Sequence, residues 1–395
     1  MSKILVEDTE EKTRVPYLKG ILIRSLQDAG LNFDEALEFA TEIRSELNDV
    51  EVISTDELRD RVVNRLKLLF RPDLVTRYEG RKKSFVIEVE NGDGQFAAFS
   101  PSEYCKCLET IGLKTEEAAA VAETLSVHLL KQETNNIQSS YIAYFTYRLL
   151  RKSKKYGPAV AHRWLVWRDF INSGRALIFM IGGTAGCGKS TTATDLASRL
   201  NILRTQSTDM LREVMRFMIP KHLQPMLHAS SYTAWKKLPY SKNHSKKKNA
   251  LLIEGYCAQA ELMSVAIKAV IQRALRENVS LIIEGVHVHP AYVDNLVDSK
   301  TAVVIPVMLG IIKQKKLRRR ITGRSTDVPK RRAEKYLKHF ESIWGLQTYL
   351  LSEADKVNTT IIVNDSRDDV FREIMLTTIN KLSEDFDKTP EQVFS

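Results

Sequence analysis

The sequence predicts an α/β protein: a parallel sheet with helices on both faces, preceded by two small, mainly helical modules. Three observations support this fold class. The continuous apolar stretch Ala176–Ile181 runs into a glycine-rich loop and then a helical pattern. Two further strand-like segments, near residues 202–207 and 280–285, end in polar or acidic residues. A pattern of short helices repeats within the first 150 residues. Strands that alternate with helices are typical of parallel sheets.

Length and composition narrow the class of protein. A chain of 395 residues predicts two or three domains. Its hydrophobic content of 43% and charged content of 27% are those of globular proteins, and no apolar run approaches the roughly 18 residues of a membrane span. The amino terminus has no apolar signal core, and four cysteines are too few for a disulfide framework. We therefore expect a soluble, cytoplasmic protein without a membrane partner.

Charge divides unevenly along the chain, whose formal net charge is +10. Residues 1–150 carry 19 Lys and Arg against 26 Asp and Glu, a balance of −7, whereas residues 151–395 carry 40 against 23, a balance of +17. The basic half is expected to meet anions, either phosphorylated metabolites or nucleic acid. A solvated basic surface is the simpler alternative.

An internal repeat occupies the first half. Ser25–Leu31 recurs 82 positions later as Cys107–Leu113, and each copy reads as a short helix that stops at a glycine and is followed by a second helix with acidic residues in its first turn. Residues 85–99 alternate apolar and polar around Asn91-Gly92-Asp93-Gly94, which predicts a hairpin. A strand pair followed by a helical bundle that ends in a helix like Ser139–Arg151 resembles the ATP-cone, a nucleotide-sensing module. The resemblance implies modules over residues 1–72 and 73–170 and a nucleotide effector; two plain helical bundles are the alternative.

The glycine-rich loop after the first predicted strand carries the pattern G-x-x-x-x-G-K-S between a strand and a helix, which is the P-loop context. Its backbone amides and the helix N-terminus suit phosphate groups, so the domain predicted over residues 171–395 is of the P-loop NTPase type and binds ATP with Mg²⁺. Lys189 is expected to bridge the β- and γ-phosphates and Ser190 to ligate Mg²⁺. The predicted nucleotide-binding residues are Gly183, Thr184, Ala185, Gly186, Cys187, Gly188, Lys189, Ser190 and Thr191.

A carboxylate is predicted at the end of the second strand, in Ser207-Thr208-Asp209. Small-molecule kinases place an aspartate there to orient or deprotonate the attacking hydroxyl, and Arg212, one turn on, could grip an anionic group. Asp209 could alternatively serve only as the N-cap of a helix over Met210–Met218.

Two segments compete for the acidic residue that completes the metal site. Ser280–Gly285 and Leu251–Gly255 both read as apolar residues followed by Glu and Gly. We favour Glu284 as a metal ligand, because a helical pattern over Ala258–Glu277 precedes it and gives strand-helix-strand spacing, whereas Glu254 leads directly into that helix.

The basic segment Lys313–Arg332 lies where kinases of this architecture have a mobile lid that supplies arginines to the migrating phosphoryl group. Arg320 and Arg324 are one helical turn apart and are predicted to be catalytic. A solvated helix face is the alternative for most of this segment.

Several short segments in order resemble the 2-phosphoglycerate kinase family: residues 182–191, Ser207–Glu213, Leu227–Ala234, Ile283–His287 and Gln347–Leu350. That family is also similar in carrying an ATP-cone before the kinase. The resemblance implies transfer of phosphate from ATP to 2-phosphoglycerate, giving 2,3-bisphosphoglycerate. It further implies that Asp209 holds the acceptor hydroxyl, that Arg212, Ser231 and Tyr232 contact the acceptor, and that His287 lies near the Walker B acid at the acceptor site.

Three functions remain open from the sequence. The first is the kinase of a small phosphorylated hydroxy-acid, or of another small molecule such as a polyol phosphate. The second is a kinase acting on an RNA- or tRNA-linked hydroxyl, although aromatic interleaving and a known RNA-binding motif are missing, so a nucleic-acid partner is not expected. The third is a nucleotide-sensing regulator without transfer. Regulation through association would make the chain a homo-oligomer.

Overall fold

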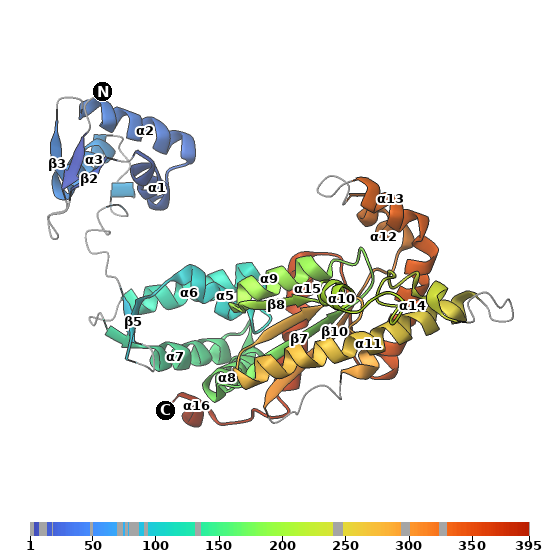
Figure 1. Cartoon of the computed structure of the whole chain (residues 1–395). Helices are drawn as coiled ribbons and strands as arrows, with labels where there is room; N and C mark the ends of the chain where they lie inside the picture. The colour runs from blue at the N-terminus through green and yellow to red at the C-terminus, as the bar shows by residue number, and fades with distance from the viewer. Residues whose placement is uncertain are drawn as a thin grey trace. The chain divides into compact units, whose positions relative to one another are not determined.

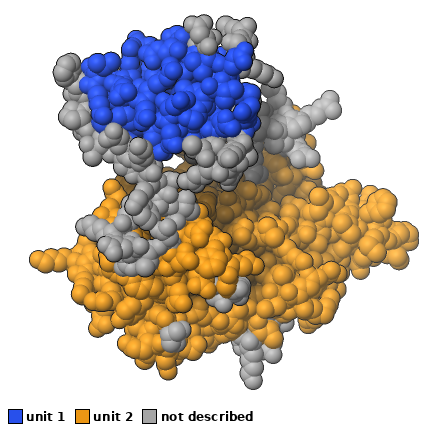
Figure 2. Space-filling model, turned by 90° about the vertical axis from the view of Figure 1, so that its left-hand side faces the viewer, with its two compact units in different colours: residues 1–86 blue, residues 87–395 orange. Residues whose placement is uncertain are grey.

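The structure of the protein is a computed structural model, in which the chain forms two compact units, residues 1–86 and 87–395 (Figure 2). Each is described by itself. The structure describes residues 4–7, 14–17, 19–47, 50–68, 74–75, 78, 87–90, 94–130, 136–239, 248–293, 301–323 and 330–394. The predicted division into three domains, at residues 72/73 and 170/171, stays a prediction.

The first unit contains a small sheet and, within its described residues, the helices α1–α3. Its elements in order are β1 (Leu5–Glu7), β2 (Arg14–Pro16), α1 (Lys19–Ala29), α2 (Phe33–Glu46), β3 (Val52–Ser54) and α3 (Thr55–Leu68). Strand β1 pairs antiparallel with β2 and parallel with β3. Asn32 and Glu35 form the capping box that begins α2. Leu26, Phe39 and Ile43 are buried in the core of this unit.

The second unit begins with the same arrangement. Its first elements are β4 (Glu88–Glu90), β5 (Phe96–Ala98), α5 (Pro101–Glu109), α6 (Thr115–Leu130), β6 (Asn136–Gln138) and α7 (Ser139–Lys152). Strand β4 pairs antiparallel with β5 and parallel with β6, as β1 does with β2 and β3. The predicted repeat and hairpin are therefore confirmed as structure, while the hairpin residues Asn91–Asp93 lie outside the described part. Membership of the ATP-cone family stays a prediction.

A five-stranded parallel sheet forms the centre of the second unit, which confirms the predicted α/β class. Its strands are β7 (Ala176–Gly182), β8 (Arg204–Ser207), β9 (Leu281–Glu284), β10 (Ala302–Gly310) and β11 (Thr360–Val363), in the order β11-β10-β7-β9-β8. All four neighbouring pairs are parallel. The chain leaves β7 toward β8 on one side and later returns to β10 on the other. The carboxyl end of β7 is therefore a topological switch point, where α/β sheets bind ligands.

Helices cover both faces of this sheet (Figure 1). The described helices of this part of the chain are α8 (Gly157–Ser173), α9 (Lys189–Leu200), α10 (Thr208–Met218), α11 (Lys248–Arg276), α12 (Gln314–Gly323), α13 (Lys330–Lys338), α14 (Phe340–Lys356), α15 (Arg367–Leu382) and α16 (Pro390–Phe394), with the short 3₁₀ turns η2 (Ala234–Lys237) and η3 (Pro290–Tyr292). Of these, α9, α10, α11, α14 and α15 contact strands of the sheet. All of β7 is buried because its alternate side chains meet different layers. Ile178 packs in the cluster that contains Ile267 of α11, whereas Phe179 shares a cluster with Phe371 of α15.

The helical module of the second unit shares the core of the sheet domain. Leu108 of α5 and Trp164 of α8 belong to the same buried cluster as Leu196 of α9 and Ile374 of α15. The indole nitrogen of Trp164 also donates to the carbonyl of Ala143, 2.9 Å away. This shared core explains why residues 87–395 form one compact unit.

Helix α11 is longer than the sequence predicted. The helix expected over Ala258–Glu277 begins ten residues earlier, at Lys248, so the apolar run Leu251–Gly255 is its first part and not a strand. By length and composition α11 could cross a membrane, but 44% of its most apolar window is buried inside the fold. Met263 and Ile271 lie in the core beside the sheet. The predicted cytoplasmic location stays a prediction.

Candidate functional site

The loop between β7 and α9 has the backbone that only glycine adopts readily. Gly183 and Gly188 have φ values of +135° and +93°. A Cβ atom on Gly183 would lie 2.5 Å from the carbonyl oxygen of Leu309, and one on Gly188 would lie 2.3 Å from the side-chain nitrogen of Asn364. The glycines of the motif therefore allow the loop to turn tightly against β10 and Asn364.

The side chains of this loop fit a phosphate ligand. The Lys189 ammonium donates to the carbonyl of Thr184 in its own loop, at 2.9 Å, and the buried Thr184 hydroxyl has no hydrogen-bond partner among the described residues. Helix α9 starts at Lys189 without a side-chain cap and without an acidic residue in its first turn. The helix thus places no carboxylate of its own at its positive end, and the residues present suit a nucleoside triphosphate.

Glu284 meets the P-loop at the end of β9. The Ser190 hydroxyl donates to a Glu284 carboxylate oxygen at 3.0 Å, and Glu284 is only 6% exposed. Glu254, the competing residue, lies within α11. A hydroxyl and a carboxylate are oxygen ligands that suit Mg²⁺, which commonly takes its remaining ligands from phosphate and water. Neither residue has been tested as a metal ligand, so these roles stay predictions.

One cavity of about 360 Å³, here called the nucleotide-side cavity, is lined by residues of the P-loop and by residues from α12 and just after the end of β11. Its lining residues are Gly186, Gly188, Thr191, Thr192, Asp195, Arg320, Gly323, Asn364, Asp365 and Arg367. Arg320 of α12 donates to the Asn364 carbonyl at 2.8 Å, and the Asn364 amide donates to the carbonyl of Cys187 at 2.8 Å. Asn364, which the sequence analysis missed, thus connects the basic helix α12 to the P-loop. Arg324 lies outside the described residues.

A second cavity, of about 270 Å³, is here called the acceptor-side cavity. Its lining residues are Ala185, Lys189, Asp209, Arg212, Ser230, Ser231, Tyr232, Val286, Lys335 and Tyr336. The structure therefore brings together the P-loop lysine and four of the residues predicted to bind an acceptor. A kinase needs this juxtaposition, because transfer requires the acceptor beside the terminal phosphate.

Asp209 lies in the first turn of α10. The N-cap of that helix is Ser207, so Asp209 does not have the capping role considered as an alternative. Its side chain is 65% exposed, and one carboxylate oxygen lies 3.7 Å from Nε of Arg212. Arg212 also donates to the carbonyls of Leu227 and Ala229, at 3.1 and 3.3 Å. Arg212 thus lines the cavity and holds the loop that precedes Ser230.

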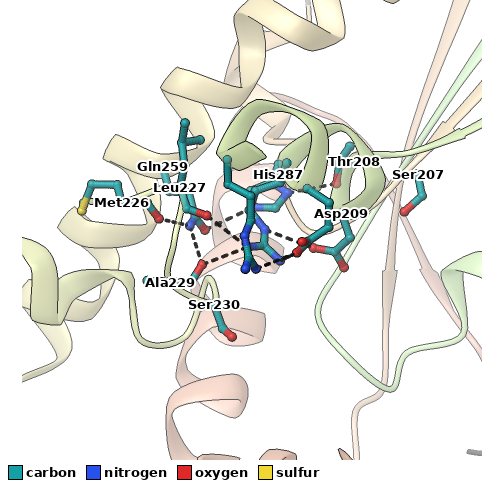
Figure 3. Close-up of polar contacts among 12 residues, drawn as sticks. Ser207, Thr208, Asp209, Met226, Leu227, Ala229, Ser230, Gln259 and His287 are labelled. Carbon is teal, nitrogen blue, oxygen red and sulfur yellow. Dashed lines mark hydrogen bonds and ion pairs between the residues drawn. The ribbon is translucent and has the colours of Figure 1, made fainter. Parts of the chain in front are cut away.

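His287 lies behind this cavity and does not line it. It is 2% exposed, and its ring nitrogens lie 3.0 Å from the Thr208 hydroxyl and 3.1 Å from the side-chain oxygen of Gln259 (Figure 3). Burial lowers the pKa of His287 to about 4, while Asp209 raises it and Arg212 and Lys189 lower it. Both ring nitrogens already have protein partners. The predicted contact of His287 with an acceptor stays a prediction.

Basic and aromatic side chains lie near Tyr232, which lines the acceptor-side cavity. The Tyr232 ring lies 5.2 Å from the His339 ring and 6.0 Å from that of Tyr336, centroid to centroid. Burial lowers the pKa of His339, and four lysines lower it further: Lys236, Lys338, Lys335 and Lys248. Sequence reasoning placed Lys335 and Tyr336 in no site, because residues beyond the basic run carry no motif of their own.

The sheet order, the P-loop at its switch point and the two cavities lined by P-loop residues define a phosphotransferase of the P-loop kinase class. No family model matches the chain. It is 32% identical over 297 residues to the 2-phosphoglycerate kinase of Pyrococcus horikoshii, which covers 75% of this chain and 94% of that protein. The protein of the same name from Pyrococcus furiosus is 33% identical over 301 residues, 76% and 95% of the two chains. That from Thermococcus kodakarensis is 29% identical over 384 residues, 96% and 99% of the two chains.

The chain therefore belongs to the 2-phosphoglycerate kinase family. It is a kinase-type phosphotransferase that acts on an alcohol group, and a kinase uses ATP. The match to the Thermococcus protein extends over almost the whole chain, so it includes residues of the first unit as well as the kinase domain.

Proposed function

We propose that this protein transfers the γ-phosphoryl group of ATP to the hydroxyl of 2-phosphoglycerate, giving ADP and 2,3-bisphosphoglycerate. The observation that carries the proposal is the acceptor-side cavity, in which Lys189 of the P-loop shares one wall with Asp209, Arg212, Ser231 and Tyr232. Its volume of about 270 Å³ suits a three-carbon acid rather than a polymer. The names of the relatives supply the substrate.

The residues divide the work between the two cavities. Bound Mg-ATP supplies the phosphoryl group and a metal ion that neutralises its charge. Residues Gly183–Thr191 hold the phosphates, while Ser190 and Glu284 hold Mg²⁺. Arg320, with Arg324 beyond the described residues, adds positive charge near the migrating group. Lys189 belongs to the P-loop and also lines the acceptor-side cavity, so it can contact both substrates.

Asp209 orients the acceptor hydroxyl and accepts its proton as the oxygen bonds to phosphorus and the bond to the β-phosphate oxygen breaks. The acceptor carries a phosphate and a carboxylate, which need positive and hydrogen-bonding partners. Arg212, Ser231 and Tyr232 supply these, and Lys335, on the same cavity wall, adds a fourth. Among the described residues of the lining, the aspartate is thus the one carboxylate, and the others are cationic, hydroxylated or apolar.

The experiment incubates the full chain with Mg-ATP and, separately, 2-phosphoglycerate, 3-phosphoglycerate, glycerol phosphate and a short RNA, and follows ADP release. We expect release above the ATP-only rate with 2-phosphoglycerate, and phosphorus NMR should show the bisphosphate product. Turnover with glycerol phosphate alone would assign a polyol phosphate as acceptor. Turnover with RNA that weakens steeply with salt would assign a nucleic acid instead.

We further propose that the two modules with the β-β-α-α-β-α order are regulatory and take a nucleotide effector. Their shared topology supports common ancestry. The second module touches the P-loop helix directly, because Arg199 of α9 forms an ion pair of 3.1 Å with Glu109 of α5. Calorimetry on the full-length Lys189→Ala variant tests this: nucleotide binding that survives the loss of the P-loop lysine supports a further site. Sedimentation with and without nucleotide tests for a homo-oligomer.

A further inference from the structure

Gln259 is a fully buried amide whose polar groups all have partners, although no motif contains it. It lies on α11 and is 0% exposed. Its nitrogen donates to the carbonyls of Met226 and Ala229, at 2.6 and 2.9 Å, and its oxygen lies 3.1 Å from Nε2 of His287 (Figure 3). A buried amide with this many partners fixes the groups around it, since each would be costly to leave unpaired.

The chemistry of these groups fixes which one donates in each hydrogen bond of the series. Because the two carbonyls can only accept, they face the NH₂ group of Gln259, and its oxygen must face His287. Nε2 of His287 therefore carries a hydrogen and donates a hydrogen bond to the side-chain oxygen of Gln259. Burial lowers the pKa of His287 to about 4, so the ring is neutral near pH 7 and its Nδ1 accepts from the Thr208 hydroxyl, 3.0 Å away. Donation runs from Thr208 through His287 to Gln259 and on to the two carbonyls.

This relay joins the two parts of the acceptor-side cavity. Thr208 is the first residue of α10 and directly precedes Asp209. It packs so closely against Gly285 that a Cβ on that glycine would lie 1.8 Å from the Thr208 hydroxyl oxygen. At the other end, the carbonyls of Met226 and Ala229 belong to the segment that leads into Ser230 and Ser231. The carboxylate and the hydroxyls of the cavity are thus connected through buried hydrogen bonds.

We propose that Gln259 is a positioning residue for phosphoryl transfer: through its three hydrogen bonds it sets where residues 230–232 stand relative to Asp209. Gln259 lines neither cavity, so it acts through these groups and not on a ligand. The P-loop is held separately, by Asn364 and by the contact of Ser190 with Glu284. Loss of the relay should therefore weaken acceptor binding and leave nucleotide binding unchanged. This inference rests on the proposed function for the identity of the acceptor.

The first test replaces Gln259 by Met, which keeps the length of the side chain and removes all three hydrogen bonds. We expect the KM for 2-phosphoglycerate to rise about ten- to hundredfold, because small misplacements of binding groups cost this much. The KM for ATP should stay within about twofold. The matched control is Gln272→Met, on the exposed face of the same helix. Equal changes in both KM values, or no change in either, would overturn the proposal.

A second pair of variants tests the far end of the relay. Thr208→Val keeps the shape of the buried side chain but removes the hydroxyl donor, whereas Thr208→Ser keeps the donor. The valine variant should show the same rise in acceptor KM as Gln259→Met, and the serine variant should restore most of the affinity. Valine and serine variants with the same kinetics would contradict a relay that depends on the hydroxyl.

Hydrogen exchange separates failure of this inference from failure of the proposed function. Amides of residues 227–233 should exchange faster in Gln259→Met than in the wild type or Gln272→Met, while those of the P-loop stay unchanged. This readout needs no acceptor. Wild-type protein without turnover on 2-phosphoglycerate would reject the proposed substrate, yet faster exchange confined to this segment would still support positioning. Unchanged exchange in Gln259→Met would reject positioning even if the kinase activity is present.

Discussion

Ser190 donates a hydrogen bond of 3.0 Å to Glu284, and this contact joins the first turn of α9 to the carboxyl end of β9. Strand β7, which precedes the P-loop and α9, is the neighbour of β9, with Ile181 opposite Glu284 in the parallel register. The hydroxyl and carboxylate oxygens therefore meet beside the P-loop, where the proposed Mg²⁺ would bind.

Glu284→Gln should raise the Mg²⁺ concentration needed for half-maximal activity about 10- to 100-fold, because it removes a negative charge while keeping the side-chain shape. Titration of activity with Mg²⁺ at saturating ATP measures this. Glu254→Gln is the matched control and should leave the Mg²⁺ requirement unchanged. The opposite pattern would reassign the metal site to the competing acid.

Those two acids show what local sequence can decide. Both follow apolar residues and precede glycine, so the pattern alone does not separate a strand end from a helix. Each glycine is required by a contact with a distant part of the chain. A Cβ atom on Gly255, which lies in a helix, would be 2.3 Å from the backbone of Trp235, whereas Gly285 has a φ of +154° and lies beside Thr208. Only the longer spacing of strand, helix and strand favoured Glu284.

The P-loop and the sheet class were predictable because their signals are contiguous in sequence. Asn364, Gln259 and Lys335 were not, since each reaches the site from a distant element and has no motif around it. Asn364 contacts a loop residue 177 positions away. A buried amide such as Gln259 resembles any polar residue on a helix until the carbonyls it meets are known.

Lys189→Ala should lower turnover on the order of 100- to 1000-fold, as removal of one preorganised donor to a developing charge does. The lysine lines the acceptor-side cavity and belongs to the nucleotide loop, so it serves both substrates. Steady-state ADP release measures the loss. Lys221→Ala, an exposed lysine in the segment after α10, is the control for a general change of charge. Wild-type rates in Lys189→Ala would refute its placement at the phosphates.

Asp209→Asn should keep ATP affinity and reduce kcat on the order of 100-fold, since general-base contributions have this size. The side chain lies on the acceptor-side cavity and outside the lining of the nucleotide-side cavity. Calorimetry with an unreactive ATP analogue and kinetics with saturating acceptor separate the two effects. Equal loss of nucleotide affinity in Asp209→Asn and Lys189→Ala would contradict the roles assigned to them.

Gly188→Ala should abolish nucleotide binding and destabilise the fold by about 1–3 kcal/mol, the usual cost of a non-glycine residue at a strained positive φ. The new methyl group would also meet the Asn364 amide that holds the loop. Gly174→Ala provides the control, because Gly174 has a φ of +64° but no atom within 4 Å of a built Cβ. The control should lose stability in thermal unfolding and retain ATP affinity.

His287 should make the protein less stable as the pH falls below neutrality. An unfolded histidine titrates near pH 6.5, whereas burial lowers the pKa of His287 in the folded chain to about 4. Between these values the unfolded state binds a proton that the folded state does not. The contribution of His287 to the free energy of unfolding is therefore complete above about pH 6.5 and is lost toward pH 4. The loss amounts to about 2–3 kcal/mol at the acid end.

Urea unfolding of the wild type and of His287→Gln from pH 7.5 to pH 4.5 isolates this contribution, because His289 and His339, whose pKa values burial also lowers, remain in both proteins. The variant should be the less stable protein at pH 7.5, where it lacks the hydrogen bonds to Thr208 and Gln259. The difference in unfolding free energy should shrink as the pH falls, since only the wild type must keep a buried imidazole neutral. A difference that stays constant over this range would mean that the folded chain protonates the ring as readily as the unfolded chain does, which would contradict the neutral ring in the relay.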